Sequence, residues 1–179
     1  MKNLLHFKYR YAKSQGFTLI ELLTVLAILG VIGTIVVAVI TMTLRGSKKA
    51  DMLENARQNG DTALSQMVKK IRYSQQLNNP ASCVGSTTVS SITVTSLSNT
   101  AQTTYACSNN TILSNTDSLI DSSTLLVTNC SFVCSQSSVS APPTITIQYT
   151  LVPKNPSTLV ESYFTLPFQS SVTMRNYTQ

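Results

Sequence analysis

One carboxylate lies near the start of a long apolar segment. Between Phe17 and Leu44 the only charged residue is Glu21. A charge at the centre of a lipid bilayer costs about 2.5–3.5 kcal/mol on insertion scales, and such residues are often functional. The plain interpretation is a carboxylate tolerated at the membrane boundary. The functional interpretation is a carboxylate with a cationic partner, because an unpaired buried charge costs several kcal/mol.

The residues before Glu21 are ordered like a processing site. Basic residues precede Gly16, and Phe17 opens the apolar run; the basic residues are Lys2, Lys8, Arg10 and Lys13. A secretory signal peptide has its small cleavage residue after the apolar region, whereas Gly16 lies before it. Cleavage at Gly16 would therefore remove the charges and keep the apolar segment.

The run Gly-Phe-Thr-Leu-Ile-Glu-Leu-Leu that begins at Gly16 resembles the class III signal peptide of type IV prepilins and type II secretion pseudopilins. The resemblance implies that a prepilin peptidase cleaves after Gly16 and methylates the new amino terminus, Phe17. It also implies that Glu21 pairs with the methylated terminus of a neighbouring subunit during assembly. The strong part of the resemblance covers residues 13–31.

The apolar segment is long enough to cross a membrane. A helix over residues 17–44 would be about 42 Å long, and the hydrocarbon core is about 30 Å thick. We expect residues 1–16 to be a cleaved cytoplasmic leader, and the C-terminal domain to lie outside the inner membrane. Without the leader, nine basic residues face seven acidic ones, so the formal charge falls from +6 to +2. The basic composition is therefore no sign of a nucleic-acid partner.

An apolar stripe extends the helix beyond the membrane segment. Its members recur at three- and four-residue steps and are Leu53, Ala56, Gly60, Leu64, Met67 and Ile71. This period predicts an amphipathic helix over residues 45–79 that covers a sheet and ends before Pro80. The basic cluster Lys69, Lys70 and Arg72 is interpreted as a solvated helix face in preference to an anion site.

Residues 80–179 form a Ser/Thr-rich region with few charges. Alternating or β-branched runs between turn residues predict antiparallel strands at residues 88–97, 102–107, 125–127, 144–152, 159–166 and 171–175. Residues 135–143 are interpreted as an exposed loop. The expected fold class is α+β, with one long N-terminal helix packed on a small antiparallel β-sheet domain.

All four cysteines lie in this exported region: Cys83, Cys107, Cys130 and Cys134. An even number in an extracellular segment predicts disulfides. Three connectivities are open, and proximity along the chain favours Cys83–Cys107 with Cys130–Cys134. The spacing lacks the paired close cysteines of a zinc site, so we expect no metal, and no cofactor.

The sequence shows no catalytic constellation, so we expect no enzyme activity. The acids of the exported region are Asp117, Asp121 and Glu161, and the only histidine, His6, lies in the leader. No nucleophile motif or phosphate-binding loop accompanies these acids. We interpret Asp117 and Asp121 as parts of a solvated turn or short helix.

The resemblance implies a structural subunit of a type IV pilus-like or type II secretion filament. The low-charge domain and the absence of a central proline favour a minor pilin or pseudopilin, with a weak likeness to the J- and W-type minor subunits. The implied partners are a prepilin peptidase, sibling subunits, an assembly platform with its ATPase, and the membrane. Two alternatives stay open: a membrane-anchored surface adhesin that does not polymerise, and a competence pseudopilin that aids DNA uptake.

Overall fold

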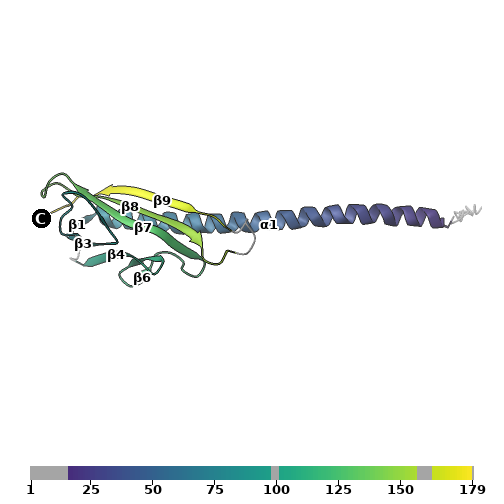
Figure 1. Cartoon of the computed structure of the whole chain (residues 1–179), viewed down its shortest axis with the longest axis horizontal. Coiled ribbons are helices and arrows are strands. Elements are labelled where there is room, and N and C mark those ends of the chain that lie inside the picture. The colour runs from purple at the N-terminus through teal and green to yellow at the C-terminus, as the bar shows by residue number, and fades with distance from the viewer. Residues whose placement is uncertain (1–15, 98–100, 157–162, 179) are drawn as a thin grey trace, which may run out of the picture. The chain divides into compact units, whose positions relative to one another are not determined.

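The computed structural model describes residues 16–97, 101–156 and 163–178. One long helix, α1 (Leu19–Arg72), precedes the strands β1 to β9, as Figure 1 shows. The expected α+β class, with an N-terminal helix packed against antiparallel sheets, is confirmed.

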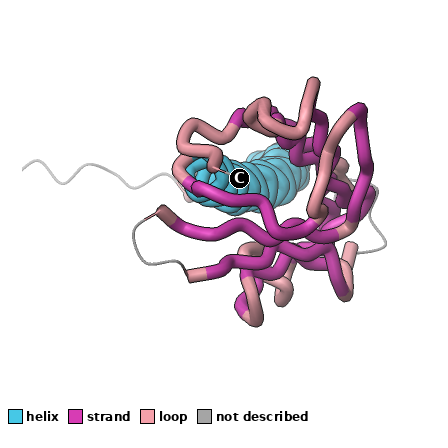
Figure 2. Tube along the Cα trace, turned by 90° about the vertical axis from the view of Figure 1, so that its left-hand side faces the viewer, coloured by secondary structure: helices cyan, strands magenta, loops and turns pink. Residues whose placement is uncertain are grey.

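The chain divides into two compact units, residues 1–46 and 47–179. The second unit contains the C-terminal part of α1 and two antiparallel sheets, with strand orders β1-β3-β4-β5-β6 and β2-β7-β8-β9. Within this unit the strands curve around the helix (Figure 2). The strand bounds are β1 (Ser74–Asn79), β2 (Gly85–Val89), β3 (Ser91–Ser96), β4 (Gln102–Ser108), β5 (Thr111–Ser114), β6 (Asp117–Ser118), β7 (Leu125–Gln136), β8 (Thr144–Pro153) and β9 (Leu166–Thr173).

Small residues on α1 let the second sheet approach the helix closely. The buried residues of α1 are Ala56, Gly60, Ala63, Met67 and Ile71, so the predicted stripe is confirmed, and Leu53 and Leu64 are only partly buried. A Cβ atom on Gly60 would collide with the ring of Phe168 in β9. A glycine at this position therefore allows the helix and the sheet to pack.

Tyr149 of β8 joins the same contact. Its ring stacks on Phe168, with ring centroids 5.3 Å apart, and its hydroxyl donates a hydrogen bond to the Gly60 carbonyl oxygen at 2.7 Å. Burial, helped by the charge of Asp61, raises the pKa of Tyr149, so its hydroxyl keeps the proton that it donates. The contact fixes the rotation of the helix relative to β8 and β9.

The helix ends earlier than the sequence predicts. Residues 74–79, which we expected to be helical, form β1 and pair with β3. Ser74 is buried, and its Oγ donates to the Lys70 carbonyl oxygen at 2.7 Å. This bond satisfies one of the last carbonyl groups of the helix, and the chain then turns into the sheet.

Several predicted strands have different bounds. The run 88–97 is divided between β2 and β3, which belong to different sheets. The inward positions Val89 and Ile92 are three residues apart, so the two-residue period of one strand is broken there. Strands at 102–107 and 144–152 are confirmed by β4 and β8.

Only residues 125–127 of β7 were predicted, because a bulge interrupts the alternation of this strand. The pairing with β8 shifts between Thr128 and Ser131, and Asn129 has a φ of 50°. After this bulge the inward alternation resumes at Phe132. The strand takes in residues 135 and 136, so the predicted loop is shorter than 135–143.

The remaining strands depend on turns. Asn109 and Asn110 both have positive φ and join Ser108 to Thr111, which is the geometry of a two-residue type I′ hairpin. This hairpin creates β5, and neither β5 nor β6 was predicted. The predicted strand 171–175 overlaps the end of β9, which begins earlier, at Leu166. Of the predicted strand 159–166, residues 159–162 lie outside the described residues, and residues 163–165 are not in a strand.

Candidate processing and assembly site

Helix α1 begins directly after the predicted cleavage junction. Thr18 Oγ1 accepts a hydrogen bond from the backbone N–H of Glu21 at 3.3 Å, which is half of a Thr-x-x-Glu capping box. Glu21 therefore lies in the first turn of the helix, where the helix dipole favours a negative charge. Thr18 was not predicted as a cap, although its spacing from Glu21 is the signal of a helix start. Gly16 and Phe17 precede this cap, and both are exposed.

The N-terminal unit presents an uncovered apolar helix. The most apolar window of α1 has a mean hydropathy of 2.9, and none of it is buried. An apolar surface of this size marks a membrane or protein contact. The threonine hydroxyls bond to carbonyl oxygens of their own helix and leave no unmet donor for an apolar environment; they belong to Thr24, Thr34, Thr41 and Thr43.

Residues 11–42 match the family model of the prokaryotic N-terminal methylation motif. The chain carries this methylation motif. The motif includes Gly16, Phe17 and Glu21, and it is consistent with the class III signal peptide of a type IV prepilin. No curated protein and no solved structure matches the chain.

The prepilin motif supports a pilin-like or pseudopilin subunit in general, and the apolar helix fits a membrane-anchored protein. The motif implies processing by a prepilin peptidase and assembly with other pilins in the membrane. The basic residues of the leader lie outside the described residues, and of these only Lys13 falls within the matched motif. The described part of the site is therefore the junction Gly16-Phe17, the Thr18 cap and Glu21, at the start of an uncovered apolar helix.

The disulfide pairs differ from those that chain proximity favours. Cys83 bonds to Cys134, and Cys107 bonds to Cys130, with Cα atoms 5.4 and 5.8 Å apart. Both bonds therefore end on β7. All four cysteines are used, which leaves no thiolate for a zinc ion.

Sheet geometry explains why the local pairing was wrong. Cys130 and Cys134 lie on one extended strand, where four residues span about 13 Å, and a disulfide needs Cα atoms within about 7 Å. Cys83 precedes β2 in one sheet, whereas Cys107 belongs to β4 in the other. The chain turns at Gly85, which has a φ of 85°, and Val84 forms a parallel bridge with Gln136 of β7. Cys83 therefore runs back along β7 and lies close to Cys134.

The two described acidic residues of the β region lie in a turn and on a strand. Asp121 accepts hydrogen bonds from the backbone and hydroxyl of Ser123 and from the Thr124 hydroxyl. These bonds lower the pKa of Asp121 and make it the cap of a turn, as expected. Asp117 is exposed as expected, but it lies on the short strand β6 and not in a turn or helix. Glu161 lies outside the described residues.

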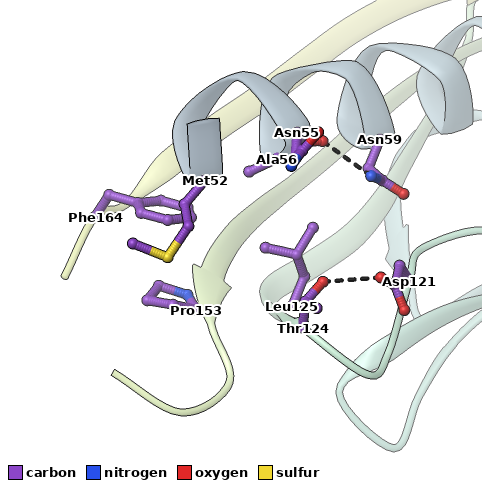
Figure 3. A pocket seen from close by; sticks show the side chains of 9 residues that line it. All are labelled: Met52, Asn55, Ala56, Asn59, Asp121, Thr124, Leu125, Pro153 and Phe164. Atoms are coloured by element: carbon purple, nitrogen blue, oxygen red, sulfur yellow. Dashed lines mark hydrogen bonds between the residues drawn. The ribbon is translucent and has the colours of Figure 1, made fainter. Parts of the chain in front are cut away.

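A cavity of about 390 Å³ lies beside this turn, between α1 and the ends of β7 and β8. Met52, Pro153 and Phe164 gather at one end, and Asn59 and Asp121 lie at the other (Figure 3). Its lining contains neither a histidine nor a cysteine, and its one carboxylate, Asp121, accepts hydrogen bonds within the turn. The cavity offers packing volume and hydrogen-bonding amides without a base–nucleophile pair.

Proposed function

We propose that this chain is a minor pilin or pseudopilin, a structural subunit of a type IV pilus-like or type II secretion filament, and not an enzyme. The observation that carries the proposal is the methylation motif at residues 11–42, which joins Gly16-Phe17 to a carboxylate in an apolar helix. A prepilin peptidase in the inner membrane removes residues 1–16 and methylates Phe17. The C-terminal unit then lies outside the membrane, where the two disulfides form.

An ion pair between subunits would drive the assembly step. In a filament the apolar helices pack on each other away from water, and Glu21 needs a cation there. The amine of Phe17 on an adjacent subunit supplies that cation, because it is the charge that cleavage creates at the same end of the helix. An assembly platform and its ATPase would extract the subunit from the membrane and add it to the filament.

The separation of cell fractions tests this function against the adhesin alternative. We expect the mature protein in the filament fraction that shearing releases from cells, together with sibling pilins, and a precursor pool in the inner membrane. The measurement is an immunoblot of sheared material and membranes, with an integral membrane protein as the control for cell breakage. Mature protein that stays wholly in the membrane fraction would support a non-polymerising adhesin.

A further inference from the structure

A groove of about 380 Å³ lies where α1 ends beside the first sheet. Its lining combines lysines and tyrosines and consists of Gln66, Lys69, Lys70, Tyr73, Ser96 and Tyr105. Tyr105 is 4% exposed and Tyr73 is 51% exposed. The groove therefore has one ring that is fixed by burial and another that is open to a ligand.

The only charged residues in the lining of this groove are Lys69 and Lys70. None of its lining residues is acidic, and Lys69 and Lys70 have no ion-pair partner among the described residues. The backbone N–H of Arg175 donates to the carbonyl oxygen of Arg72 at 2.9 Å. The fold thus brings an arginine from the far end of the chain to the basic cluster at the end of α1.

Helix stability explains only part of this arrangement. Cations in the last turn of a helix offset its dipole, and each contributes about 0.3–1 kcal/mol. That effect accounts for Lys69, Lys70 and Arg72 on α1. It does not explain the exposed ring of Tyr73 inside the groove.

We propose that this groove binds single-stranded nucleic acid. The lysine ammonium groups attract backbone phosphates, while an unpaired base enters the groove and stacks on Tyr73. Sites for single strands combine a cationic track with aromatic platforms in this way, and they tolerate different sequences because every base has a stacking face. Base pairs in a duplex are stacked on each other, so a duplex can use the cations but not the groove.

The arrangement sets the size of the effects. Each phosphate neutralised on a single strand contributes about −0.7 to the slope of log K against log salt, so the two lining lysines, Lys69 and Lys70, give a slope of up to about −1.4. Removing both lysines should reduce its magnitude by about 1.4. Removing the Tyr73 ring should weaken binding about 5- to 150-fold, the range of one lost base stack.

The test uses the full mature chain in non-ionic detergent and a fluorescein-labelled oligonucleotide of about 15 nucleotides, within the range of known single-strand sites. Fluorescence anisotropy measures binding of the strand alone and of the strand annealed to its complement, at several salt concentrations. We expect tighter binding of the single strand, a flatter salt dependence for Lys69→Gln/Lys70→Gln, and weaker binding for Tyr73→Ala. Tyr73→Phe keeps the ring and should bind like the unchanged protein.

The matched control is Lys48→Gln/Lys49→Gln, which removes two lysines from the same helix away from the groove. It should leave both the affinity and the salt slope unchanged. Equal binding of single strand and duplex, an affinity that Tyr73→Ala does not change, or an equal loss in the control would each overturn the proposal. These outcomes would indicate that the groove attracts polyanions in general or binds an acidic protein. Because the assay uses the purified chain, its result does not depend on whether the chain enters a filament.

Discussion

Glu21→Ala should leave the chain in the membrane and remove it from the filament. The substitution takes one charge out of an apolar helix, so insertion should be as favourable as before or slightly more so. In the filament, however, it leaves the methylated amine of a neighbouring subunit without its partner. Losing one member of a buried ion pair costs about 3–5 kcal/mol, which corresponds to at least a 100-fold lower incorporation. The measurement is the ratio of mature protein in sheared filaments to mature protein in membranes.

Glu54→Ala is the matched control for this experiment. Glu54 is an exposed carboxylate on the same helix, in the C-terminal unit and outside the apolar segment. Its replacement should leave the ratio of filament to membrane protein unchanged. An unchanged ratio for Glu21→Ala would show that Glu21 is only a tolerated carboxylate at the start of the helix, held by its place after the Thr18 cap.

Removing the disulfide between Cys83 and Cys134 should be the most destabilising change in the C-terminal unit. The bond closes a loop with a sequence separation of 51, and loop-closure entropy makes such a bond worth about 4 kcal/mol. The bond between Cys107 and Cys130 closes a loop of 23, worth about 3 kcal/mol. We therefore expect both double alanine variants to unfold at lower urea, and Cys83→Ala/Cys134→Ala at the lowest.

Urea unfolding followed by tyrosine fluorescence checks this order. With a dependence of about 2 kcal/mol per molar urea, the larger loss shifts the midpoint by about 2 M. Peptide mapping of the unreduced protein checks the pairing itself, by finding the peptides of Cys83 and Cys134 linked. Linked peptides of Cys83 and Cys107 would contradict the connectivity in the structure.

The features that could be predicted are those with a local physical cause. The three- and four-residue period of apolar and small residues on α1 predicted the buried face, because one helix face is set by spacing alone. The clean alternation in Thr144–Val152 predicted β8 for the same reason, since one face of that strand is buried. Gly16, Phe17 and Glu21 lie in the matched motif because their order is a contiguous signal.

The features that could not be predicted depend on partners distant in sequence. Residues 74–79 become β1 because β3 pairs with them, although their own sequence does not alternate. Cys83 pairs with Cys134 because strand order, which is not visible in the sequence, places β2 beside β7. Cys107 pairs with Cys130 because the two sheets meet at β4 and β7. The groove at the end of α1 also needed the structure, because Ser96 and Tyr105 reach it from β3 and β4.

Mass spectrometry of the mature amino terminus tests the central claim most directly. Protein purified from cells of the native host, or from cells with a prepilin peptidase, is digested and its N-terminal peptide is sequenced. The account predicts a peptide that begins at Phe17 and carries one methyl group on its α-amine. A mature chain that begins elsewhere, or an unmodified amine on Phe17, would contradict the account.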